Sequence, residues 1–161
     1  MRILVCLLLL GVCLFSCDEN SKKTELKEIS QIVIFDKESV LLEEEFVELE
    51  KTLFMFKKNT SHSMVLVTTP NYEDYKNIKE YSIGIGNMLG VGKKDLNDGI
   101  IIVFSETMGE VRISVGDGLN QVLTNKVCEE IIDNVMIPDF KKGLIFNGLI
   151  NGVKHIEDKL K

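Results

Sequence analysis

The chain has 161 residues and a formal net charge of −6, from 19 basic and 25 acidic side chains. This acidic balance argues against a nucleic-acid partner, because such proteins need basic patches to contact phosphate. It also argues against electrostatic attraction to an anionic lipid surface. The length is sufficient for one domain with a single core.

Residues 1–16 have the features of an export signal. Arg2 provides a positive start, and residues 3–12 are almost entirely apolar but too short for a permanent membrane span. Ser16 directly precedes Cys17 in a sequence that resembles the lipobox of bacterial lipoproteins, in which this cysteine carries the lipid. We therefore expect a lipoprotein signal peptide over 1–16 and lipidation at Cys17. The alternative is an ordinary secretory signal that happens to contain cysteines.

Residues 17–30 are polar and charged, and we expect them to tether the domain to the lipid. The expected location is the cell envelope, with the domain outside the cytoplasm and attached to a membrane through its N-terminal lipid. Cys6 and Cys13 would leave with the signal, so Cys128 would be the only free thiol and no disulfide is expected. Because Cys128 lies among apolar residues, it is interpreted as a small core residue rather than a nucleophile.

Hydrophobic periodicity predicts alternating strands and helices over residues 31–161. Residues 64–69 and 99–105 are nearly continuously apolar, which indicates strands buried on both faces, whereas 111–115 alternates and indicates a half-exposed antiparallel strand. The expected strands are 31–35, 64–69, 99–105 and 111–115, and the expected helices are 38–58, 72–89, 126–137 and one from 139 onward, separated from the previous helix by Pro138. This order predicts a single-domain α/β/α sandwich with a mixed, roughly four-stranded sheet.

Common nucleotide and nucleophile motifs do not fit the chain. The glycines of residues 84–90 have the wrong spacing for a dinucleotide fingerprint and end a predicted helix. Gly92-Lys93 lacks the first glycine and the Ser or Thr of a P-loop. Neither His62 nor His155 has a nucleophile partner visible in the sequence, so no catalytic triad is predicted.

Carboxylate and amide side chains lie at the ends of several predicted strands. They are Asp36, Asn97, Asp98, Asp117, Asn120 and Asn125. Calcium takes six to eight oxygen ligands from such groups, so loops that meet at one sheet edge would form a divalent-metal site. The alternative is turn chemistry, because Asn-Asp-Gly and Gly-Asp-Gly are favoured turn sequences.

A series of short motifs runs in order over about residues 31–160. The motifs are Val33-Ile34-Phe35-Asp36, Gly90-Val91-Gly92-Lys93-Lys94 before Asn97-Asp98-Gly99-Ile100, Val115-Gly116-Asp117-Gly118-Leu119, and Ile137-Pro138-x-Phe140-Lys141-x-Gly143. This series resembles the TPM domain, which is common in bacterial envelope proteins. The resemblance implies an α/β/α sandwich that is exposed outside the cytoplasm and tethered to a membrane. It also implies divalent-metal binding at acidic loops, chiefly of calcium, a proposed acid phosphatase activity, and accessory roles in membrane complexes.

The chain departs from the family pattern at the implied metal site. The family usually has Asp-Asn before a glycine where this chain has Asn97-Asp98. The usual glutamate after Gly-Leu is Asn120, the usual aspartate after Leu-Thr is Asn125, and Asp36 is kept. Because calcium affinity follows ligand charge, the expected dissociation constant is at best roughly 10⁻⁴ to 10⁻³ M.

The sequence therefore predicts a lipid-anchored envelope protein with a TPM-type domain over 31–161 and a binding or accessory role. Its expected ligands are calcium or another divalent metal, bound weakly, and an envelope protein, with no nucleic acid. Two alternatives remain, a metal-assisted acid phosphatase and a structural interaction module that has lost its ion.

Overall fold

The structure is a computed structural model that describes residues 33–161. The predicted signal peptide (1–16), the lipidation site Cys17 and the tether (17–30) lie outside the described residues, so these stay predictions. No helix in the described part of the chain is long and apolar enough to cross a membrane.

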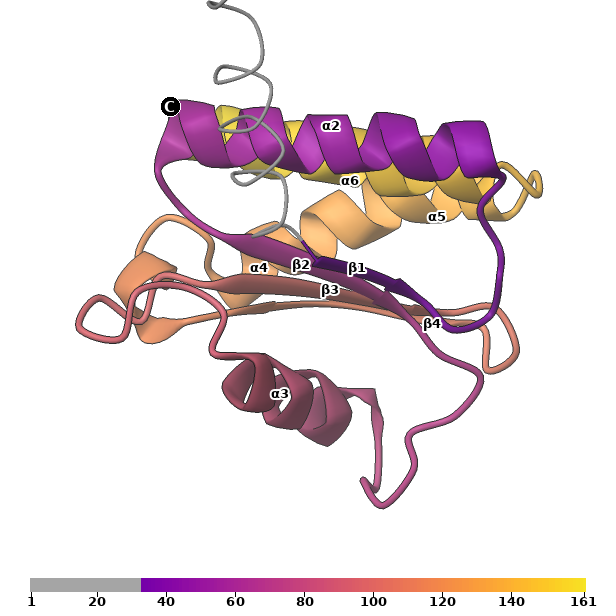
Figure 1. The fold of residues 1–161 in the computed structure, drawn as a ribbon, viewed down its shortest axis with the longest axis horizontal. Helices are drawn as coiled ribbons and strands as arrows, with labels where there is room; N and C mark the ends of the chain where they lie inside the picture. The colour runs from indigo at the N-terminus through magenta and orange to yellow at the C-terminus, as the bar shows by residue number, and fades with distance from the viewer. Residues whose placement is uncertain (1–32) are drawn as a thin grey trace, which may run out of the picture. The chain divides into compact units, whose positions relative to one another are not determined.

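A four-stranded sheet forms the middle layer of the domain (Figure 1). Its strands are β1 (Val33–Asp36), β2 (Met64–Thr68), β3 (Ile100–Ser105) and β4 (Glu110–Val115), and they lie in this order across the sheet. The first three strands are parallel, and β4 pairs antiparallel with β3. The predicted mixed sheet is confirmed, with β1 and β4 at its two edges.

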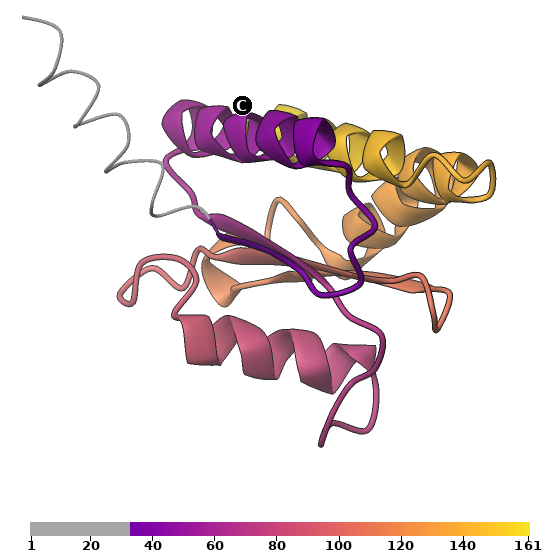
Figure 2. The ribbon, with the colours of Figure 1, turned by 45° about the vertical axis from the view of Figure 1, so that its right-hand side comes forward.

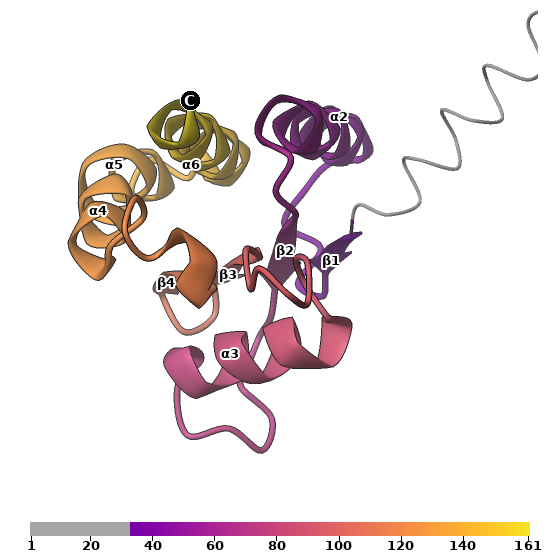
Figure 3. The ribbon, with the colours of Figure 1, turned by 90° about the vertical axis from the view of Figure 1, so that its left-hand side faces the viewer.

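Helices cover both faces of this sheet. They are α2 (Glu43–Thr60), α3 (Ile78–Leu89), α4 (Asn125–Ile131), the π-helical segment η2 (Ile132–Met136), α5 (Ile137–Phe140) and α6 (Ile145–Leu160). Figure 2 and Figure 3 show α2, α4, α5 and α6 on one face and α3 alone on the other. This arrangement confirms the predicted α/β/α sandwich.

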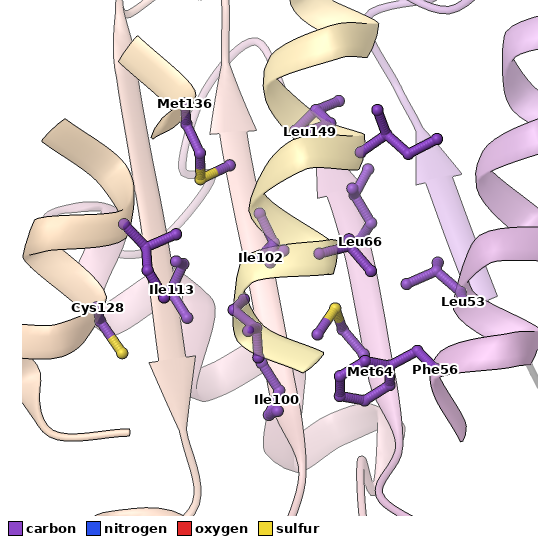
Figure 4. Close-up of a cluster of buried hydrophobic side chains, with 14 of the residues drawn as sticks. Leu53, Phe56, Met64, Leu66, Ile100, Ile102, Ile113, Cys128, Met136 and Leu149 are labelled. Carbon is purple, nitrogen blue, oxygen red and sulfur yellow. The ribbon is translucent and has the colours of Figure 1, made fainter. Parts of the chain in front are cut away.

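The strands divide their side chains between two hydrophobic cores, because successive residues of a strand point to opposite faces. Met64 and Leu66 of β2 join the larger core under α2 and α6, whereas Val65 and Val67 join the smaller core beside α3. Figure 4 shows part of the larger core, where Phe56 of α2 lies beside Met64. Burial on both faces explains why β2 and β3 are continuously apolar.

The first helix begins later than the sequence predicts. The expected span is 38–58, but α2 begins at Glu43. The carboxylate of Asp36 accepts hydrogen bonds from the N–H groups of Val40 and Leu41, at 3.2 and 3.0 Å. These contacts hold the residues before α2 in a loop, because the two N–H groups bond to a side chain instead of to the carbonyl oxygens of a preceding helical turn.

The other helix boundaries also have local causes. The helix expected over 72–89 starts only at α3, where the Asn77 side chain accepts a hydrogen bond from Glu80 N–H and caps the first turn. The sequence predicts that Pro138 separates two helices, but Pro138 lies in α5, directly after the π-helical turn of η2. The chain instead breaks before α6, where Gly143 has a φ of 75°, a conformation that favours glycine.

Candidate functional site

Asp36 lies at the end of the sheet opposite to the other predicted metal ligands. Its Oδ1 accepts a hydrogen bond from Thr68 Oγ1 at 2.5 Å. The register aligns Asp36 with Thr68 and Phe104, whereas the other candidates begin just before Ile100, about 13 Å away at roughly 3.3 Å per residue. Asp36 ends the parallel strand β1, whereas Asn97 and Asp98 precede β3 and the remaining candidates follow the antiparallel strand β4, so the structure does not bring Asp36 together with them. Its contacts instead stabilise the loop before α2.

The other predicted residues are distributed around the amino end of β3. There the turn before β3 (residues 96–99, the Asn97 turn) meets the loop after β4 (residues 116–120, the Asp117 loop). Gly118 N–H donates a hydrogen bond to Asn97 O at 3.0 Å. A Cβ atom on Gly116 or Gly118 would collide with a carbonyl oxygen of the Asn97 turn. The glycines of the Gly-Asp-Gly sequence are therefore explained by close backbone packing.

Asp98 is the buried carboxylate of the Asn97 turn, and it accepts hydrogen bonds from other groups of the protein. Only 2% of the residue is exposed. Its carboxylate accepts a hydrogen bond from Lys93 N–H at 2.6 Å and lies 3.0 Å from His62 Nδ1. Burial alone would raise the pKa of Asp98, but the hydrogen bonds from Lys93 N–H and His62, together with their positive charges, hold it below its usual range. Asp98 therefore stabilises the fold and does not offer open oxygens to a ligand.

Asp117 is the exposed carboxylate of the Asp117 loop. Its Oδ1 accepts a hydrogen bond from Asn120 Nδ2 at 2.9 Å, and its Oδ2 lies 3.4 Å from Asn97 Nδ2. The family pattern has acidic residues among these positions. In this chain the amides of Asn97 and Asn120 donate to Asp117 and stabilise its negative charge, whereas carboxylates at these positions would repel it.

A cavity of about 660 Å³, which we call the β4 cavity, runs along β4 between α3 and α4. Its polar wall includes Asp117, Asn120, Asn125, Glu129 and Asp133. Sequence reasoning missed Glu129 and Asp133. The available signal was their spacing. Asn125, Glu129 and Asp133 follow one another at intervals of four residues, so they share one side of a helix.

Arg112 of β4 also lines the β4 cavity and supplies positive charge. Its Nε donates a hydrogen bond to Ser114 Oγ at 3.0 Å, and Ser114 Oγ lies 2.7 Å from Ser82 Oγ of α3. Within residues 33–161, Arg112 forms no ion pair. The two terminal guanidinium nitrogens are thus free to contact a bound group.

The donor set limits what this region could bind as a metal. In the described part of the chain, no three His, Cys, Asp or Glu side chains are grouped closely enough to hold a metal ion. A cation near Asp117 would therefore need amide oxygens, backbone carbonyls or water as further ligands. This composition fits a hard, weakly bound cation better than a zinc or iron centre, which prefer His and Cys.

Solved structures from three bacteria share this fold. The N-terminal domain of a protein from P. gingivalis has a TM-score of 0.72 and 23% identity, with 83% of each chain covered. The BA42 protein from Bizionia argentinensis has a TM-score of 0.66 and 19% identity, with 74% of this chain and 81% of that chain covered. The N-terminal domain of cg2496 from Corynebacterium glutamicum has a TM-score of 0.61 and 7% identity, with 94% and 86% covered.

Comparison with curated proteins finds no match. The model of the TPM domain family, in contrast, matches residues 34–159, which is nearly the whole described domain. The chain therefore belongs to the TPM domain family.

Proposed function

We propose that this protein is a lipid-anchored accessory protein of the cell envelope, whose TPM domain lies outside the cytoplasm and binds its ligand in the β4 cavity. The anchor is supported by the sequence, in which a short apolar segment ends at Ser16-Cys17 and a polar tether follows. No helix of the described domain offers a membrane span, so the proposed attachment depends on lipid at Cys17.

The binding role is supported by one observation in particular. Charged groups of both signs line the β4 cavity, and within the described residues none of them forms an ion pair. These groups are Lys79, Arg112, Asp117, Glu129 and Asp133. Charged side chains that converge on one concave surface without internal partners are typical of binding sites.

A divalent cation is the proposed ligand of the acidic wall. Asp117 and Glu129 supply carboxylate oxygens, and Asn120 and Asn125 supply amide oxygens. Since amides replace carboxylates of the family pattern at both asparagines, we propose weak calcium binding, with a dissociation constant of roughly 10⁻⁴ to 10⁻³ M.

A calcium titration of the full-length protein in detergent micelles, followed by amide NMR, tests this function. We expect saturable shifts at Asp117, Asn120 and Glu129 and none in the loop that follows Asp36, because that loop lies at the far end of the sheet. A parallel magnesium titration reports on selectivity. No shift at about 10 mM calcium, or shifts confined to the Asp36 loop, would remove the cation from the proposed function.

Metal-assisted acid phosphatase activity is the second candidate. The observation in its favour is that Arg112 and Asp117 line the same cavity, because phosphoryl transfer uses a cation to contact the phosphate oxygens. Arg112 is however the only arginine of the described domain, so bidentate contacts to phosphate would depend on a single side chain. We therefore favour binding over catalysis.

A further inference from the structure

The outer edge of β4 presents unpaired backbone groups along its length. Gly116 N–H donates to Gly99 O at 2.9 Å, and the register continues without a bulge from this pair to Ser105 and Glu110. In an antiparallel ladder, hydrogen-bonded pairs alternate with pairs whose N–H and C=O groups point away from the partner strand. Three residues of β4 therefore direct their N–H and C=O groups to the open edge. They are Val111, Ile113 and Val115.

Independent hydrogen bonds support this alternation. Phe104 O accepts from Thr69 N–H at 3.1 Å, and Ile100 N–H donates to Ser63 O at 2.9 Å. These two residues of β3, which lie opposite Val111 and Val115, thus direct these groups toward β2 rather than toward β4. Within residues 33–161, no other hydrogen bond reaches the outward groups of β4.

The β4 cavity lies directly against this open edge. Val111 to Val115 all line it, and its two sides come from α3, through Lys79 and Ile83, and from α4 and η2, through Glu129 and others. Figure 3 shows β4 at the edge of the sheet, with α3 on one side and α4 on the other. The volume of about 660 Å³ falls within the roughly 300 to 1,000 Å³ typical of binding clefts.

The β4 cavity and the open edge of β4 together form a groove, and this groove suits a single extended chain. Three outward pairs of donors and acceptors match an added strand, whose backbone has the same repeat along the edge. A whole sheet with its own covering helices would collide with the helices that form the walls of the groove. A second copy of this chain paired through β4 would, in addition, bring its own Arg112 close to the first, and like charges on adjacent strands are destabilising.

The two faces of the groove indicate the chemistry of this chain. Val111, Ile113 and Val115 point toward the larger core, and Ile132 extends the apolar surface beside them. The exposed acids Glu129 and Asp133 also line this side, so acidic residues of an added strand would be repelled there. On the other face lie Arg112, without an ion pair, and the exposed side chain of Lys79. An added strand would therefore place apolar residues on one face and acidic residues on the other.

We propose that an extended segment of a partner protein, with alternating apolar and acidic side chains, binds along β4 as a fifth strand. This inference rests on the accessory role proposed above and gives it a partner class, but it requires no bound cation. Peptide binding is measured in EDTA and calcium binding is measured without peptide. A negative result for one proposal therefore leaves the other proposal standing.

The probes are two synthetic peptides of equal length, one alternating valine with glutamate and one alternating valine with lysine. Each is titrated in EDTA against the full-length protein in detergent micelles, with fluorescence anisotropy and amide exchange as readouts. We expect the glutamate peptide to bind at least about tenfold more tightly than the lysine peptide. We also expect it to slow exchange at the outward amides of Val111, Ile113 and Val115.

Two controls make the result specific. Arg112→Glu should reverse the preference between the two peptides, whereas Lys94→Glu, the same charge change in a loop that does not line the β4 cavity, should leave it unchanged. Two further versions of the glutamate peptide are N-methylated, one at all valine amides and one at all glutamate amides. We expect just one of these two versions to lose binding. Only alternate amides of an added strand face β4.

Several results would overturn the proposal. They are absence of binding at millimolar peptide, equal binding of both peptides to the wild-type protein, equal effects of the two methylated sets, and exchange protection outside β4 only. Protection of the outward amides that depends on protein concentration in the absence of peptide would instead identify a second copy as the occupant.

Discussion

The carboxylate of Asp98 lies 3.0 Å from Nδ1 of His62, and this partly buried contact joins the turn before β2 to the turn before β3. The N–H of Lys93 completes the arrangement at 2.6 Å. A buried carboxylate that receives donors from two separate turns ties those turns together, because its removal would leave the donors unsatisfied.

We expect Asp98→Asn to lower the free energy of unfolding by about 1 to 3 kcal/mol near neutral pH. Despite burial, the hydrogen bonds and positive charges hold the pKa of Asp98 below its usual range. Its stabilising contribution is therefore present above about pH 4 and is lost as the pH falls through the lower pKa of the folded state. Urea denaturation of both proteins as a function of pH measures the effect. Asp95→Asn, an exposed change in the same loop, is the control and should change stability little.

The asparagines at the proposed calcium site make a second prediction. Asn120→Glu combined with Asn125→Asp adds two negative charges near Asp117 and should tighten calcium binding by about tenfold, because ligand charge sets calcium affinity. Isothermal titration calorimetry measures the gain. Asn147→Asp places one charge on an exposed position of α6 and should have no effect. If the double variant binds no better than the wild type, turn chemistry is sufficient to explain these residues.

A third prediction distinguishes binding from catalysis. The purified protein should hydrolyse para-nitrophenyl phosphate no faster than background, with or without calcium or magnesium. Enzymes for this reaction supply very large accelerations, of up to about 10²¹, and need several positioned cations or metal-bound water. Activity that copurifies with the protein and disappears in both Arg112→Ala and Asp117→Ala would establish the phosphatase instead.

The proposed anchor makes a fourth prediction. Cys17→Ala should abolish incorporation of radiolabelled palmitate and leave a protein that is uncleaved or released from membranes. Cys13→Ala removes another cysteine of the same segment and should leave labelling intact. Unchanged labelling of the Cys17 variant would favour an ordinary secretory signal.

Much of the fold could be predicted because burial leaves a direct trace in sequence. Residues 64–69 and 99–105 are nearly continuously apolar since both faces of β2 and β3 are covered. The helix starts could not be predicted in the same way. They depend on local side-chain hydrogen bonds. Asp36 accepts from Val40 N–H and keeps the residues before α2 out of the helix, whereas Asn77 accepts from Glu80 N–H and caps the first turn of α3.

The candidate site was harder to predict than the fold. Grouping Asp36 with Asp117 ignored strand direction, because Asp36 ends β1 whereas Asp117 follows β4, which runs antiparallel to β1, so the two residues lie at opposite ends of the sheet. The role of Asp98 depended on its contact with His62, which is 36 residues away in sequence. The unpaired edge of β4 required the register, which no local pattern specifies.

The uneven covering of the sheet has a consequence for how the domain opens. Since α3 alone covers one face, its detachment would expose only the smaller core, and local unfolding of α3 should cost less than unfolding of the whole domain. Lys79 and Ile83 of α3 also form one wall of the β4 cavity. A ligand in that cavity would therefore protect α3 from proteolysis by mass action, so susceptibility to cleavage within α3 would report occupancy of the cavity.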